Sequence, residues 1–126
     1  RVVDGLTDPE YRRRLRRRQR LRQAVMTVMA DHRLDAILYP HQRRLVVPIG
    51  EPQRERNGVL SNGTGFPAIT FPGGFSIPTA TAPVGVPIGI ELLGGEWSEP
   101  KLFRLAYAFE QAADIRKSPA ATPPLN

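Results

Sequence analysis

Two stretches of the chain carry apolar residues at helical spacing. The first predicts a helix over residues 9–33, in which the apolar positions recur every three or four residues. Its start has two candidate caps: Asp8 followed by Pro9 at the first helical position, or a capping box of Thr7 and Glu10. The apolar stripe of this helix consists of Tyr11, Leu15, Leu21, Val25, Val28, Met29 and His32.

The second periodic stretch predicts a helix over residues 98–116, with Ser98 as its N-cap. We expect its apolar face to cover a sheet, with Leu105 and Phe109 at the centre of the contact. The basic residues 116–117 then fall in the last turn, where positive charge is favoured. The stripe consists of Leu102, Leu105, Ala106, Phe109, Ala112 and Ala113.

Short apolar runs bounded by proline or glycine predict three strands. Residues 35–39 are four apolar residues after an aspartate, which is typical of a strand buried on both faces, and Pro40 should end it. Residues 68–71 lie between two prolines and should form a strand of only about four or five residues, ended by Pro72. Residues 88–93 form the third strand, which we expect to pair antiparallel with the second.

The order of these elements predicts an α/β fold, namely part of a mixed β-sheet covered by helices, with about three short strands and two main helices. A polar connection of some twenty residues, 41–61, separates the first two strands, and a connection of this length is usually functional or mobile. Three strands alone leave sheet edges unpaired. Because the first residue is Arg1 and not methionine, we expect the sequence to belong to a longer chain.

The net charge of +6 is concentrated in the first helix. Eight arginines lie between Arg12 and Arg22, so the rest of the chain carries a net charge of about −2. Such a helix could bind the phosphates of nucleic acid or anionic lipid, or its arginines could pair with acidic groups elsewhere in the protein or in a second copy within a homodimer. Because Tyr11 is the only aromatic residue near the arginines and a recognised nucleic-acid-binding motif is missing, the second alternative is favoured.

The amino-acid composition bears on metal sites, on membrane helices and on the location of the protein. The chain contains no cysteine, which excludes disulfides and thiolate metal sites, and its two histidines lack clustered carboxylates, so we expect no metal and no cofactor. No stretch approaches the roughly 18 to 20 apolar residues of a membrane helix, so we expect no membrane partner. A cysteine-free chain suits the reducing cytosol, and we expect a cytoplasmic protein.

Several motifs appear in a fixed order along the chain. Residues 62–74 read N-x-T-G-x-P-A-I-x-x-P-x-G, residues 87–94 read P-x-G-x-x-L-L-G, and residues 99–110 read E-x-x-L-x-x-L-A-x-A-F-E. Residues 34–40 add a D-x-x-L-x-P-type strand. In this order they resemble the C-terminal portion of an amidase signature family enzyme, of the amidase or amidotransferase A-subunit type.

The resemblance implies that the chain, 1–126, is the C-terminal segment of a larger amidase domain. That family hydrolyses amides with a serine, a second serine in a cis peptide and a lysine, in a Gly/Ser-rich stretch far upstream of these motifs. The segment should then supply sheet and substrate-pocket wall, have no catalytic residue of its own and be inactive in isolation. Its parts are the basic helix 9–33, the strands and long loops 34–95, the helix 98–116 and the tail 117–126.

The serines and lysines present agree with this expectation, because they form no Gly/Ser-rich cluster. They are Ser61, Ser76, Ser98 and Ser118, with Lys101 and Lys117. The expected partners are the upstream part of the same amidase and a small-molecule amide substrate. The alternative is a non-catalytic module that binds nucleic acid or a partner protein through the arginine helix.

The resemblance also implies where substrate would lie. In that family the connection after the first strand passes the substrate pocket, so the candidate substrate-binding residues are Tyr39, His41, Gln42 and Asn62. His41 could equally be a solvated loop histidine, and Asn62 could hold a tight turn through its amide. The structural motif residues are Asn62, Gly65, Pro67, Pro72, Gly74 and Gly89.

Overall fold

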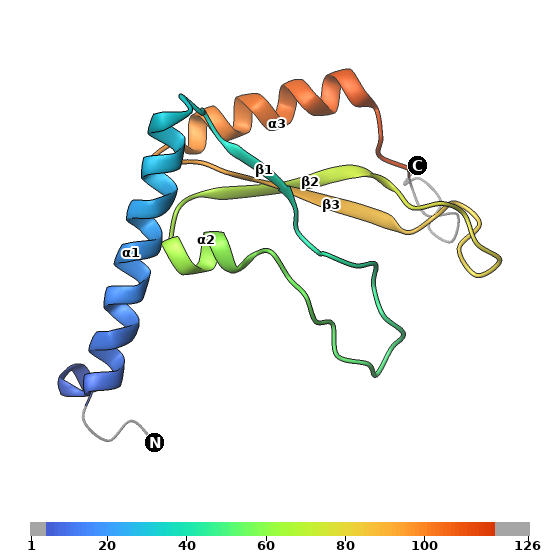
Figure 1. The fold of residues 1–126 in the computed structure, drawn as a ribbon. Coiled ribbons are helices and arrows are strands. Elements are labelled where there is room, and N and C mark those ends of the chain that lie inside the picture. The colour runs from blue at the N-terminus through green and yellow to red at the C-terminus, as the bar shows by residue number, and fades with distance from the viewer. Residues whose placement is uncertain (1–4, 118–126) are drawn as a thin grey trace.

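The computed structural model describes residues 5–117, and Figure 1 shows its helices and strands. Two long helices and one short helix accompany a three-stranded sheet, so the predicted α/β class is confirmed. In chain order the elements are a 3-10 turn (Gly5–Thr7), α1 (Pro9–Asp31), β1 (Ile37–Pro40), α2 (Val59–Thr64), β2 (Ala68–Phe75), β3 (Pro87–Leu93) and α3 (Glu99–Ala113).

The sheet has the strand order β1-β3-β2, and both neighbouring pairs are antiparallel. The expected antiparallel pairing of the last two strands is therefore confirmed. β3 lies in the centre, and its Glu91 is level with Tyr39 of β1 and Thr70 of β2. Residues that face each other across a ladder point to the same side of the sheet, so these three side chains share one face.

Helices cover the two faces of the sheet. On one face Val25 of α1, Phe66 and Leu93 of β3 form a buried cluster. On the other face the ring of Phe109 in α3 packs against Phe71 of β2, with the ring centroids 5.1 Å apart. Figure 1 shows α3 running along one side of the strands and α2 on the other.

The first helix starts with one of its two candidate caps. The carboxylate of Asp8 accepts a hydrogen bond from the backbone N–H of Glu10 at 2.7 Å, and Pro9 is the first helical residue. This is the N-cap arrangement in which a short acidic side chain satisfies an unpaired helix donor. The helix ends at Asp31, two residues earlier than expected, before Arg33 adopts a positive φ of 51°.

Two strand predictions were wrong in detail. β2 continues past Pro72 to Phe75, because β2 is an edge strand and a register shift lies between Pro72 and Gly74. Proline is tolerated at edges and bulges, where its missing N–H breaks no ladder bond. β1 is also an edge strand, and its Leu38 is 57% exposed, so β1 is not covered on both faces in the described residues.

A short helix, α2, forms where a tight turn was expected. Its sequence has low intrinsic helix propensity, since four of its six residues are valine, serine, asparagine and glycine. The hydroxyl of Thr64 donates to the carbonyl of Leu60 at 2.7 Å, and Gly65 ends the helix in the left-handed conformation at φ 70°. Tertiary contacts, described below, stabilise the helix end, and the sequence pattern does not reveal them.

The face of α3 that packs on the sheet includes Leu102, Ala106 and Phe109 of the predicted stripe, but its centre differs from the one predicted. Leu102 and Ala106 are buried, at 2% and 7% exposed, whereas Leu105 is 39% exposed. The contact is centred on positions 102, 106 and 109, which are spaced by four and three residues. Leu105 lies beside this stripe, so its predicted central place was wrong, whereas Phe109 packs on the sheet as expected.

The ends of α3 also depart from the prediction. Ser98 occupies the N-cap position, but its hydroxyl donates to the carbonyl of Gly95 at 2.7 Å and caps no helix N–H. At the other end Asp114 adopts a left-handed conformation at φ 42° and terminates the helix after Ala113. Residues 116–117 therefore follow the helix and do not belong to its last turn. Of the predicted tail, residues 118–126 lie outside the described residues.

Candidate functional site

Glu91 is a carboxylate in the middle of the central strand, and its residue is only 3% exposed. The phenol of Tyr39 donates a short hydrogen bond to Oε1 of this carboxylate. Nδ1 of His41 lies 2.7 Å from the other oxygen, Oε2. Tyr39, His41 and Glu91 therefore form one hydrogen-bonded cluster across the β1–β3 ladder, which we call the Glu91 cluster.

The electrostatics of the Glu91 cluster favour a charged carboxylate. Burial raises the pKa of Glu91, but the hydrogen bonds from Tyr39 and His41 together place its pKa below the usual value of 4.5. Burial and the adjacent carboxylate raise the pKa of Tyr39 far above its usual value. At neutral pH, Glu91 is an anion and Tyr39 is a neutral donor.

The backbone around His41 is fixed by Asn57. The side-chain amide of Asn57 donates to the carbonyl of Pro40 at 2.8 Å, and its backbone N–H donates to the carbonyl of His41 at 2.9 Å. The next rung is the N–H of Arg43, which donates to the carbonyl of Glu55 at 2.9 Å. These hydrogen bonds join the beginning and the end of the long connection after β1, next to the Glu91 cluster.

Gly58 makes room for the imidazole. A Cβ atom at this position would lie 2.6 Å from Cε1 of His41, closer than side-chain atoms approach one another. Glycine therefore lets the start of α2 pack directly on the His41 ring. The ring lies between this backbone and the carboxylate of Glu91, and 38% of the His41 side chain is exposed.

Two surface pockets adjoin this region. One, of about 420 Å³, is lined by Ile37, Tyr39, Arg56, Asn57, Val59 and Leu60. The other, of about 380 Å³, is lined by Pro40, Gln42, Arg43, Arg44, Leu45, Val46, Pro87, Ile88 and Gly89. Oε1 of Gln42 is buried and has no hydrogen-bond partner among the described residues. A buried amide oxygen without a partner is an acceptor that a bound group could use.

The structure thus brings together only some of the predicted site residues. Tyr39 and His41 share Glu91, whereas Gln42 lines a different pocket. Asn62 lies on α2 with an exposed side chain, and its backbone carbonyl accepts a hydrogen bond from Arg18 at 3.4 Å. Sequence reasoning missed Glu91, although a single carboxylate inside the apolar run of β3 was the signal that could have revealed it.

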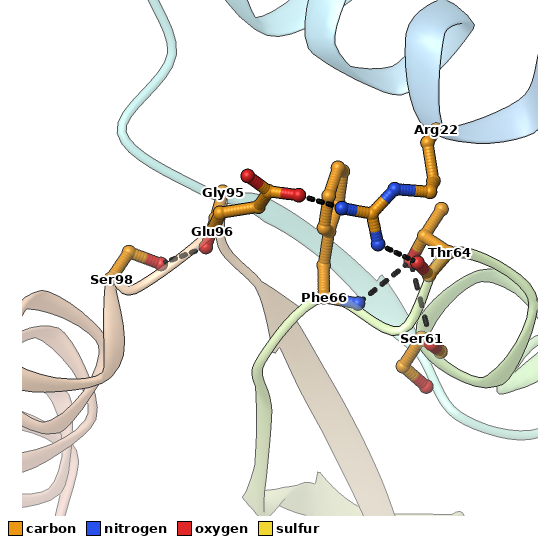
Figure 2. Close-up of polar contacts among 7 residues, drawn as sticks. All are labelled: Arg22, Ser61, Thr64, Phe66, Gly95, Glu96 and Ser98. Carbon is orange, nitrogen blue, oxygen red and sulfur yellow. Dashed lines mark hydrogen bonds and ion pairs between the residues drawn. The ribbon is translucent and has the colours of Figure 1, made fainter. Parts of the chain in front are cut away.

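Arg22 of α1 connects three segments at the motif that follows α2, as Figure 2 shows. Its guanidinium donates to the carbonyl of Thr64 at 2.5 Å and forms an ion pair with Glu96 in the loop before α3. The same guanidinium lies 4.8 Å from the centroid of the Phe66 ring, within cation–π range. Arg22 therefore links α1 to the end of α2 and to the β3–α3 loop.

Arg18, one turn earlier, extends this arrangement, since its Nε donates to the carbonyl of Gly63 at 3.1 Å. Arg18 and Arg22 satisfy the last carbonyls of α2, which have no partner inside the helix. A Cβ atom at Gly63 would lie 2.7 Å from Leu21, so glycine lets α1 approach α2 closely. These two arginines serve the fold of this chain.

Within the described residues, the three serine hydroxyls and the ammonium group of Lys101 bond to other groups and not to one another. The hydroxyls of Ser61, Ser76 and Ser98 each donate to a backbone carbonyl, those of residues 58, 77 and 95. Lys101 is 2.6 Å from the carboxylate of Asp35. Ser118 lies outside the described residues.

Metal and membrane features are both missing from residues 5–117. These residues contain no group of three or more histidine, cysteine, aspartate or glutamate side chains placed to hold a metal ion. None of their helices combines the length and the apolar character that crossing a membrane requires.

Known proteins resemble the chain in sequence. No family model matches it. An Arabidopsis thaliana protein named "Probable amidase" is 33% identical over 118 residues, which are 94% of this chain and 19% of the relative. The glutamyl-tRNA(Gln) amidotransferase A-subunit of Ruegeria sp. (strain TM1040) is 33% identical over 125 residues, which are 92% of this chain and 24% of the relative.

A solved structure matches the fold as well. The native peptide amidase of Stenotrophomonas maltophilia superposes with a TM-score of 0.71 at 31% identity, and the match covers 94% of this chain and 23% of the peptide amidase. The chain spans about a fifth to a quarter of the length of these relatives.

Proposed function

Because this chain belongs to the amidase signature family, we propose that it is the C-terminal segment of a longer amidase that hydrolyses a carbon–nitrogen amide bond. The observation that carries the proposal is a match over nearly the whole chain, in sequence and fold at once, to about a quarter of a peptide amidase. The reaction would use a serine, a second serine and a lysine, all supplied by the upstream part of the same protein.

The chemistry of the described residues supports an upstream nucleophile. Covalent catalysis on an amide needs a hydroxyl whose proton a nearby base accepts, and donors directed at the developing oxyanion. Ser61, Ser76 and Ser98 instead donate to backbone carbonyls. The chain by itself is therefore expected to be inactive, and the upstream part of the amidase is its principal partner. Hydrolysis by this route needs no cofactor.

The role proposed for this segment is to form part of the substrate-pocket wall. Tyr39 lines one of the two pockets and shares Glu91 with His41. Gln42 lines the other pocket and presents a buried carbonyl oxygen that could accept an N–H of a small amide. Asn62 has an exposed side chain on α2, one residue from Ser61. These four residues remain our candidates for substrate binding, and a homodimer and a cytoplasmic location remain predictions.

The alternative function, binding of nucleic acid or a partner protein through residues 12–22, is less favoured. Arg18 and Arg22 are engaged with α2 and the loop before α3. Arg13 and Arg14 both contact Glu10, one turn earlier in the helix. Nε of Arg12 also donates to the carbonyl of Leu6 at 3.4 Å. At least five of the eight arginines thus have partners within this chain, which agrees with a structural role for the helix.

Hydrolysis of primary amides by the complete protein tests the proposal. Ammonia release should be measured for the complete protein, for the 126-residue chain and for the complete protein carrying His41→Asn. We expect turnover by the complete protein, none by the chain alone and a reduced kcat/KM for the variant. Turnover by the chain alone, or a complete protein that hydrolyses no amide, would overturn the proposal.

A further inference from the structure

We propose that Glu91 is a positioning residue that holds His41 with a protonated Nδ1, so that the Nε2 lone pair can accept an N–H of the amide substrate. The identity of the substrate rests on the proposed function above. The arrangement of the imidazole does not, and it can be measured without any reaction.

The proton assignment follows from the partners of the ring. Nδ1 of His41 is 2.7 Å from Oε2 of Glu91, and an ionised carboxylate can only accept a hydrogen bond. Nδ1 must therefore carry a proton. In the neutral imidazole a proton on Nδ1 leaves Nε2 unprotonated, which makes Nε2 an acceptor.

Glu91 is itself fixed in place. Its Oε1 accepts from the phenol of Tyr39, so both carboxylate oxygens are engaged and a rotation would break two hydrogen bonds. The residue is 3% exposed, which makes an unpaired orientation costly because water cannot replace the lost partners. The raised pKa of Tyr39 keeps this phenol a donor at neutral pH.

The imidazole is restrained from the other side as well. A side chain at Gly58 would collide with Cε1 of the ring, and the backbone N–H of Asn57 donates to the carbonyl of His41. The backbone N–H of His41 donates to the carbonyl of Gly89 at 3.2 Å. The His41 side chain is 38% exposed. A Cβ atom at Gly58 would lie 3.4 Å from Nε2, so the glycine keeps the space next to this nitrogen free of a side chain.

An unprotonated Nε2 has a definite chemical preference. It accepts a hydrogen bond from primary or secondary amides, which carry an N–H, and it gains nothing from a tertiary amide. One hydrogen bond contributes about 0.5 to 1.5 kcal/mol net, which corresponds to roughly a 2- to 13-fold effect on kcat/KM. The Glu91 cluster would therefore favour substrates whose amide nitrogen bears hydrogen.

The direct test is the tautomer of His41 in the 126-residue chain. The chain has only two histidines, so long-range proton–nitrogen NMR spectra contain two imidazoles, and the signals of His41 are assigned with His41→Asn. His32, exposed at the end of α1, is the internal reference. The spectra are recorded at about pH 8.5, roughly two units above the ordinary pKa of a model imidazole.

We expect His41 to be protonated on Nδ1, and His32 to show a mixture of tautomers. Glu91→Gln should weaken this preference, because an amide can accept from or donate to the ring. Gly58→Ala should weaken it too, because the added Cβ displaces the ring while Glu91 stays. Glu51→Gln, at an exposed carboxylate, is the control with the same charge change and should leave the spectrum unchanged.

A second readout concerns substrates of the complete protein. Glu91→Gln should raise KM for a primary amide and lower kcat/KM by the 2- to 13-fold range given above, yet leave the N,N-dimethyl analogue unaffected. A wild-type His41 protonated mainly on Nε2, or with the same mixture as His32, would overturn the inference. A fixed Nδ1 proton in a protein without amide turnover would contradict the proposed function and leave the positioning role in place.

Discussion

Replacing Arg22 by glutamine should destabilise the chain more than the same replacement at any other arginine of residues 12–22. The guanidinium combines a hydrogen bond to the Thr64 carbonyl, an ion pair with Glu96 and a cation–π contact with Phe66. Glutamine is too short and uncharged, so it loses all three contacts and leaves the last carbonyl of α2 without its donor.

The magnitude follows from the three contacts. A hydrogen bond from a charged donor contributes about 1.5 to 3 kcal/mol. The ion pair adds about 0 to 1 kcal/mol, because the side chains of Arg22 and Glu96 are 35% and 46% exposed and solvent screens their charges. The cation–π contact adds about 0.5 to 1 kcal/mol at such a site. Since contacts of one side chain are not additive, we expect a total of about 2 to 4 kcal/mol.

Urea unfolding of the 126-residue chain, followed by circular dichroism, measures this free energy. Arg20→Gln is the matched control, because Arg20 lies on the same helix, carries the same charge and is exposed. The control should change the free energy of unfolding by less than about 0.5 kcal/mol. Equal effects of the two substitutions would refute the structural role assigned to Arg22.

Two further predictions concern packing and pH. Leu102→Ala should cost about 2 to 5 kcal/mol because Leu102 is buried, whereas Leu105→Ala should cost about 1 kcal/mol or less, and equal urea midpoints would mean that the face of α3 is assigned wrongly. The lowered pKa of Glu91 means that its contribution to stability is present above pH 4.5 and is lost as pH falls through the folded-state pKa. Urea midpoints between about pH 7 and 3 should therefore fall more steeply for the wild type than for Glu91→Gln, and parallel curves would contradict the pairing.

The elements that local sequence dictates were predicted well. The Asp8 cap and Pro9 determined the start of α1, and the glycines and prolines around residues 88–93 determined the limits of β3. The pairing of β2 with β3 followed from their proximity in sequence. In each case the deciding interactions lie within a few residues of one another.

The missed features depend on partners far away in the chain. α2 is held by Arg18 and Arg22, more than forty residues earlier, and its own sequence favours a turn. The length of β2 could not be read from Pro72, because the effect of a proline depends on whether the strand is at an edge. The stripe of α3 was misplaced by one flanking position, Leu105, because periodicity does not fix where a sheet touches a helix.

The Glu91 cluster illustrates the same limit for function. The family resemblance singled out Tyr39 and His41, but Glu91 lies some fifty residues later. Only the register of β1 against β3 brings these side chains together. A register set by strands so distant in sequence cannot be derived from periodicity, although a carboxylate in an apolar strand indicates that a partner exists.

Labelling with a fluorophosphonate reagent, followed by mass spectrometric identification of the modified serine, tests the central claim most directly. The claim is that this segment supports an amidase whose nucleophile lies upstream. The reagent should leave the four serines of the 126-residue chain unmodified and should label one serine of the complete protein, upstream of this segment. Labelling of Ser61, Ser76, Ser98 or Ser118 in the chain alone would contradict the claim.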